Sequence, residues 1–314
     1  MENAGDGPRS GKSSQGPAGP GLAEVLVVWA LCGLIGLSIL LTYSREPHET
    51  LYHVSGGGLS GGLSRLLVFV NWPGALIAIA VLGVVLDRVR KPLLGLIALL
   101  LCAAIVIPGV VEQSDLDAKW INIVPAIGVG LVLVLTALAA RDGIGGWGDS
   151  RGDWLRVAVF VVLALVSVPW FLAEQGVYAG DIPGLRSIFY SKQVYHGEVA
   201  VHLGEHHGLV GLQLMTIALL LSRELPRMRE SIRRTALAVW LSGLIAYGAG
   251  NIANDAWGEQ VVKRGWTTWT LPSVVRPDLN WLWLVVLAVT AVIFFTALKP
   301  RRDQAATDPV SSST

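Results

Sequence analysis

Charged residues are scarce in this chain. Asp, Glu, Lys and Arg make up 15% of its 314 residues, whereas soluble domains carry about 25%. Hydrophobic residues account for 53%, and the mean hydropathy is +0.56. This balance indicates a protein of the lipid bilayer. A formal net charge of only +1, with no basic patch interleaved with aromatic residues, argues against nucleic acid as a partner. We therefore expect membrane lipids, and no nucleic acid, around this chain.

Cysteine is almost absent as well. The two cysteines, Cys32 and Cys102, both lie within apolar runs, which argues against a disulfide framework and against a thiolate metal site. Lysine is missing from the middle of every long apolar run, which argues against a retinal Schiff base. No insertion of the size of a soluble domain separates these runs, so the chain is interpreted as one domain.

The apolar sequence forms eight runs of about 20 residues, each long enough to cross a hydrocarbon core of about 30 Å as a helix. We therefore predict an all-α integral membrane protein, a bundle of about eight transmembrane helices. The predicted spans lie near 23–43, 66–87, 92–111, 121–140, 154–174, 197–222, 235–255 and 280–298. They form one polytopic domain over 22–299. The Gly-, Ser- and Pro-rich tails at 1–21 and 300–314 are expected to be disordered.

Basic residues are concentrated in alternate loops, after the second, fourth, sixth and eighth spans. By the positive-inside rule these loops and both termini are cytoplasmic. That orientation places every histidine on the outer side and leaves the cytoplasmic side with little besides arginine. The basic residues are Arg88, Arg90, Lys91, Arg141, Arg151, Arg156, Arg223, Arg227, Arg229, Arg233, Arg234, Lys299, Arg301 and Arg302. The expected location is a cell membrane, specifically a bacterial cytoplasmic membrane.

The stretch from 195 to 221 contains four of the six histidines. On a continuous helix, Glu198, His202, Glu205 and His206 would share one face. His202 and His206 would then be one turn apart and could bind one metal ion, and zinc, iron or copper would suit imidazole and carboxylate ligands. The alternative is an interfacial helix whose histidines bind neighbours or lipid headgroups. Ionisable groups at membrane depth are costly, so four on one face favour a functional site.

Other polar residues on the predicted outer side could join this site. His48 and His53 lie in the first outer loop and could complete a metal shell if that loop folds back; a solvated loop is the alternative. The seventh span ends in a polar group, Asn251, Asn254, Asp255 and Glu259. Of these, Asp255 is predicted either as a further metal ligand or as the residue that orients a ligating histidine. Glu112 and Glu174 also end spans, and would handle protons only if recruited inward.

These features favour a metal-dependent membrane enzyme, a hydrolase or an oxidoreductase, with Glu198 or Glu205 as general base. Its substrate would be a lipid or another amphiphile, because the site lies near headgroup depth. A metal-ion or proton transporter is the first alternative, since Gln213 and Thr216 extend the polar face inward. The second is a haem- or quinone-binding redox protein. A single outer haem would there be ligated by His202 or His206 together with His48 or His53.

Overall fold

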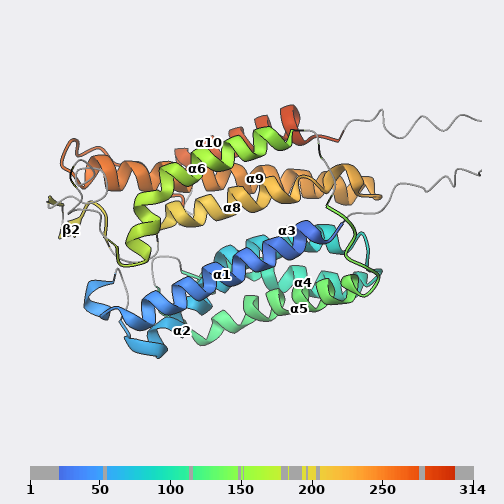
Figure 1. Ribbon diagram of the computed structural model, residues 1–314, viewed down its shortest axis with the longest axis horizontal. Helices are drawn as coiled ribbons and strands as arrows, with labels where there is room; N and C mark the ends of the chain where they lie inside the picture. The colour runs from blue at the N-terminus through green and yellow to red at the C-terminus, as the bar shows by residue number, and fades with distance from the viewer. Residues whose placement is uncertain are drawn as a thin grey trace, which may run out of the picture.

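The computed structural model describes residues 21–51, 55–112, 116–147, 150, 152–177, 183, 193–195, 197–202, 206–275 and 280–300. Within these residues the chain forms a bundle of eight antiparallel helices (Figure 1), seven of them long and apolar enough to cross a membrane. The eighth, Pro92–Val106, is shorter. The predicted fold class, a multi-pass helical membrane protein, is therefore confirmed.

Most elements follow the predicted spans, and the sixth span is the exception. In chain order they are α1 (Ala23–Arg45), η1 (His48–Thr50), α2 (Gly58–Phe69), η2 (Val70–Gly74), α3 (Ala75–Val85), α4 (Pro92–Ala103), η3 (Ala104–Val106), η4 (Trp120–Asn122), α5 (Ile123–Ala140), α6 (Asp153–Glu174), β1 (Val194–Tyr195), β2 (Glu198–Val199), α8 (His207–Leu221), η6 (Leu225–Arg227), α9 (Ser231–Trp257), η7 (Gly258–Val262), α10 (Trp281–Ile293) and η8 (Phe294–Leu298). Helices α2 and α3 are one continuous helix that passes through the π-helical turn η2, which contains Pro73.

Helix α3 lies at the centre of the bundle, packed against α4, α5, α8 and α9. Helices α6 and α10 lie on its rim, and only 11% of each apolar segment is buried by protein. Their exposed Leu, Val, Phe and Trp side chains suit contact with lipid tails. Helices α8 and α9 cross closely, because Gly211 and Gly248 face each other so closely that a Cβ on either would overlap the backbone of the other. Small residues permit such close approach of membrane helices.

The loops after α3, α5 and α8 meet at one end of the bundle, here called the basic end (Figure 1). Arg88 Nη2 donates to Gly143 O at 2.6 Å, and Arg229 N donates to Asp87 Oδ2 at 2.9 Å, so the three loops are linked. Helix α1 begins and α10 ends at this end (Figure 1). The basic loops therefore share one side as the sequence predicts, and their cytoplasmic location remains a prediction.

The basic end contains buried ion pairs. The expectation that this side has little besides arginine is therefore wrong. Glu24, fully buried in the first turn of α1, accepts a hydrogen bond from Arg223 Nε at 3.0 Å. Arg223 also pairs with Asp153 at the start of α6, and Arg227 Nη1 lies 2.7 Å from Glu224 Oε1. These five residues, here called the basic-end cluster, connect α1, α6 and the segment after α8.

The predicted span 197–222 is wrong at its start, because α8 begins only at His207 and the described residues 197–202 and 206 are not helical. Strands β1 and β2 pair Val194 with Val199, and Gly197 between them has a φ of +87°, which a helix cannot contain. His206 is itself extended, with φ −108° and ψ 143°. Glu198 and His202 therefore do not share a helical face with His206, and Glu205 lies outside the described residues.

Candidate metal centre

His202 and His206 lie against each other just before α8. Their rings stack with centroids 4.5 Å apart at an interplanar angle of 19°. His206 Nε2 lies 3.0 Å from the His202 carbonyl oxygen. Both residues are buried, with 9% and 2% of their surface exposed. The fold thus brings together two imidazoles that the sequence predicts on consecutive turns of a helix.

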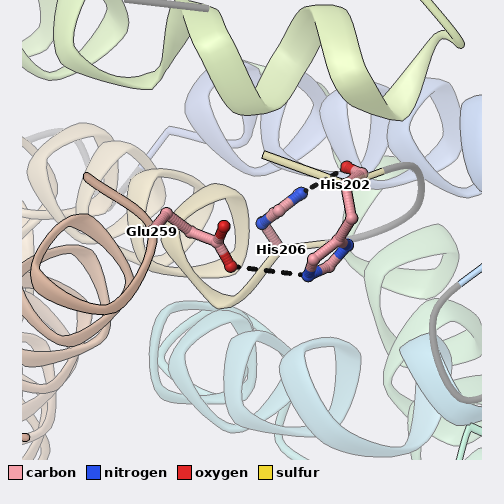
Figure 2. Close-up of side chains that lie close together, drawn as sticks. All are labelled: His202, His206 and Glu259. Carbon is pink, nitrogen blue, oxygen red and sulfur yellow. Dashed lines mark hydrogen bonds and ion pairs between the residues drawn. The ribbon is translucent and has the colours of Figure 1, made fainter. Parts of the chain in front are cut away.

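Glu259 approaches the two histidines from η7, at the end of α9, as Figure 2 shows. Its Oε1 lies 3.4 Å from His202 Nε2. One nitrogen from each histidine and one carboxylate oxygen of Glu259 all lie within 4.8 Å of one another. Three buried ligand atoms at this spacing could hold a metal ion. We call this group, His202, His206 and Glu259, the His-His-Glu group.

The carboxylate of Glu259 has one oxygen that is not used by hydrogen bonds. Oε1 is 2.8 Å from Lys263 Nζ, whereas Oε2 is buried and has no hydrogen-bond partner among the described residues. A buried acceptor without a partner is unfavourable by roughly 1–3 kcal/mol. An additional ligand at Oε2, such as a metal ion, would remove this cost. Glu259 also lies in a π-helical turn, a distortion that is frequent at functional sites.

Asp255 lies one helical turn before Glu259 and contacts the group from the side. Its Oδ2 is 3.5 Å from His206 Nδ1 and accepts a hydrogen bond from Gly208 N at 2.8 Å. It therefore orients His206 and also caps the N-terminus of α8, where backbone N–H groups lack helical partners. Of the two predicted roles for Asp255, this position favours the orienting one. A carboxylate behind a ligating histidine is the usual outer-shell arrangement in metal sites.

The electrostatics of His206 follow from these contacts. Burial alone would lower the pKa of His206, but the hydrogen-bonded Asp255 carboxylate, with Glu259 and the His202 carbonyl, outweighs it and raises the pKa above the ordinary value. Both ring nitrogens of His206 have an oxygen partner, which is the pattern that favours a charged imidazole. A metal ion would replace the proton on one nitrogen and leave the other to Asp255.

Trp170 on α6 covers the other side of the site. Its ring lies 6.4 Å from that of His206 at an interplanar angle of 28°, and it fills the space above Gly208, where a Cβ would overlap it. Trp170 is 1% exposed. One indole ring therefore lies between the first turn of α8 and the rim helix α6.

The structure places the remaining predicted residues elsewhere or leaves them undescribed. His48, in η1, pairs with Glu49 at 3.4 Å, its side chain is 41% exposed, and it is not part of the His-His-Glu group. His53 and Glu205 lie outside the described residues. Glu198 lies in β2, where only its backbone is described. Whether any of these completes a metal shell or serves as base remains a prediction.

The two other helix-end carboxylates differ in their surroundings. Glu112 pairs with Lys119 at 3.0 Å, and both side chains are largely exposed. Glu174 is only 3% exposed and lies one turn beyond Trp170 on the buried face of α6. Of the two carboxylates, only that of Glu174 is therefore buried in the protein.

Glu259 is the member of the group that sequence reasoning did not assign as a ligand. The signal was present in its spacing, since Asn251, Asp255 and Glu259 recur every four residues and so share one face of α9. This face lies against the start of α8, as the contacts of Asp255 show. Without the packing of α8 on α9, the sequence gives no reason to prefer Glu259 to the other outer carboxylates.

Compared with models of protein families, with curated proteins and with solved structures, the chain matches none of them. The interpretation of the site therefore depends on its chemistry alone. Two imidazoles and one carboxylate form the ligand set of catalytic zinc sites, in which a fourth position is left for water or substrate. Axial histidines of one haem lie on opposite faces of the porphyrin, so two rings stacked at 4.5 Å favour a small ion over a haem held between them.

Proposed function

We propose that this protein is a metal-dependent membrane enzyme that binds one divalent ion, Zn²⁺ in the first instance, through His202, His206 and Glu259. The observation that carries the proposal is the convergence of three buried ligand atoms within 4.8 Å. Two further observations support it: Oε2 of Glu259 has no hydrogen-bond partner among the described residues, and the Asp255 carboxylate lies behind His206. A bound ion at a three-ligand site can activate water or polarise a substrate oxygen.

The depth of the site supports a lipid or another amphiphile as substrate. Asp255 lies 24 residues after Ser231, the first residue of α9, which is about 36 Å along a helix and exceeds the hydrocarbon thickness of about 30 Å. Trp257 and Trp269, in edge-to-face contact beside this helix end, are residues of the membrane interface. A site at this level meets headgroups rather than acyl tails, which favours hydrolysis of a headgroup bond. Glu198 or Glu205 remains the predicted general base.

Metal analysis of the purified protein tests the first part of this proposal. We expect about one zinc ion per chain after equilibration with Zn²⁺ and removal of excess, measured by plasma mass spectrometry. H202A, H206A and E259Q should each lower this stoichiometry to near zero, because a buried site with two protein ligands binds weakly. H207A is the matched control, since His207 is adjacent in the chain and outside the His-His-Glu group. A wild-type protein without metal, or equal loss in H207A, would contradict the assignment.

Turnover tests the second part. Zinc-loaded protein in liposomes of bacterial lipid should release water-soluble headgroup products detectable by mass spectrometry, and E259Q should not. If the protein binds one zinc ion per chain but turns over no lipid class, the metal site stands and the proposed enzymatic activity is contradicted.

A metal-ion or proton transporter is the second candidate, and one observation favours it. His206 just before α8, Gln213 within it and Glu224 just after it are all buried, so buried polar residues occur along the whole length of this helix. Gln213 Nε2 also donates to Cys32 Sγ at 3.7 Å. Fully buried apolar residues, Ile217 and Leu221, lie between Gln213 and Glu224, so the enzyme is preferred. Zinc or proton flux in proteoliposomes, abolished by Q213L, would reverse this preference.

A further inference from the structure

Lys263 shares a carboxylate with the His-His-Glu group. Its Nζ lies 2.8 Å from Glu259 Oε1, and the same oxygen lies 3.4 Å from His202 Nε2. The Glu259 side chain is 5% exposed and that of Lys263 is 18% exposed. This ion pair is therefore shielded from solvent. Charges in such a buried position interact more strongly than charges at the surface.

The main chain of Lys263 also determines where Glu259 lies. Lys263 N donates to Gly258 O at 2.8 Å, five residues back, and this hydrogen bond closes the π-helical turn that carries Glu259. Backbone and side chain of one residue thus fix the position of the carboxylate. A substitution of the side chain leaves the backbone contact intact, so the two contributions can be separated.

The two oxygens of Glu259 have different surroundings. Oε1 is engaged by Lys263, and Oε2 has no hydrogen-bond partner among the described residues. A metal ion could therefore bind Oε2 without displacing the ammonium group. The ammonium would then remain within a few ångströms of the ion, and like charges at that distance in a buried site repel strongly.

We infer that Lys263 is a positioning residue that limits the metal affinity of this site: its ammonium neutralises Glu259 whether or not a metal ion is bound, and it opposes the incoming ion. This inference rests on the proposed function. With Glu259 already paired, the protein does not require the metal to compensate a buried charge. The metal is then exchangeable, as at catalytic sites, rather than a permanent part of the fold.

Zinc affinity measured by competition with a chromophoric chelator tests this inference. The purified full-length protein in detergent is compared with K263Q, K263M and K263R, with Zn²⁺ as the only added metal. K263Q keeps a donor for Glu259 and loses the charge, so it should bind zinc about tenfold more tightly or better and release it more slowly to excess chelator. K263M should show the same gain, and K263R, which keeps the charge, should stay within about threefold of wild type.

The outcomes separate this inference from the proposed function. K119Q is the matched control, because it removes a lysine that pairs with Glu112 at 3.0 Å outside the His-His-Glu group, and its affinity should not change. Unchanged or weaker binding in both K263Q and K263M would overturn the role of Lys263 and leave the metal site intact. A wild-type protein that binds no zinc would overturn the proposed function instead. If K263Q does not fold, the zinc affinities of K263M and K263R are compared instead, and equal affinities would overturn the role of Lys263.

Discussion

Asp255 holds two different groups with one carboxylate. The oxygen that caps Gly208 N is the one nearest His206 Nδ1, so helix capping and histidine orientation depend on the same atom. The helical N-terminus also favours a negative charge by its dipole. The start of α8 and the direction of the His206 ring are consequently fixed together.

An asparagine at this position separates the two roles of Asp255. D255N retains an oxygen that can accept from Gly208 N but loses the charge that holds His206. We expect zinc affinity to fall about 10- to 100-fold, the range for outer-shell partners of ligating histidines, while the melting temperature changes little. D255A, which also loses the cap, should lower stability by about 1 kcal/mol more. Equal zinc affinity in D255N and wild type would show that Asp255 serves only as a cap.

At the scale of single residues, His202 and His206 were predictable as partners in one site, and Glu259 was not. The two histidines are close in the chain, so nearly any compact local structure brings their rings within reach of a common ion. Glu259 is more than fifty residues away, and its approach depends on the crossing of α8 and α9. His48 shows the converse, since the predicted fold-back of its loop was conditional and the structure pairs it with Glu49.

Among the elements, the α8–α9 crossing has the largest effect on the site because it joins the helices that carry His206 and Glu259. Gly211 and Gly248 allow this crossing, since neither has a Cβ. Gly211 lies about one turn after His206, and Gly248 lies about three turns before Glu259. A shift of α8 here would therefore move His206 relative to Asp255 and Glu259.

A larger side chain at this crossing should separate the helices. G211V places a branched side chain against the Gly248 carbonyl oxygen, and we expect about 1–3 kcal/mol of destabilisation together with weaker zinc binding. The measurement is unfolding in detergent by circular dichroism. G130V is the control, because no atom lies within 4 Å of a Cβ at Gly130. Equal stability of the two variants would show that the crossing tolerates a side chain.

The positions of the membrane helices were predictable, and the start of α8 was not. Length and hydropathy alone determine whether a segment can span a bilayer, which is why seven predicted spans coincide with long helices and the third with a shorter one. In the stretch before α8 the polar residues also recur at helical spacing, so the pattern indicates a helix through 197–206. The positive φ of Gly197 is incompatible with a helix there, and the cap from Asp255 makes α8 begin at His207. The contact with Asp255 is a tertiary contact, which no local sequence pattern contains.

At the scale of the whole molecule, α8 is held at both ends by charged groups from other helices. Asp255 of α9 holds its beginning, and Glu24 of α1 with Asp153 of α6 holds Arg223 just beyond its end. Trp147 adds a cation–π contact to Arg223 at 4.7 Å. The basic-end cluster therefore fixes the register of the helix that leads to the His-His-Glu group.

Removal of Arg223 tests this connection. R223M leaves Glu24, which is fully buried, without its closest partner, and loss of one partner of a buried pair typically costs about 3–5 kcal/mol. We expect a correspondingly lower free energy of unfolding in mild detergent. E230Q, which disrupts the exposed Glu230–Arg233 pair at 3.4 Å, should change stability by less than about 1 kcal/mol. Similar effects of the two substitutions would contradict a structural role for the cluster.

The length of α9 has a consequence for the surroundings of the site. With its π-helical end the helix spans 32 residues, Ser231–Val262, or about 48 Å, well beyond the hydrocarbon layer. Its polar last turns therefore extend past the acyl chains, and the thickness of the bilayer determines how far Glu259 stands above them. Long-chain lipids would bring the His-His-Glu group closer to hydrocarbon, and short-chain lipids would leave it nearer to water. Acyl-chain length thereby becomes a variable that governs how readily ions and water reach the end of this helix.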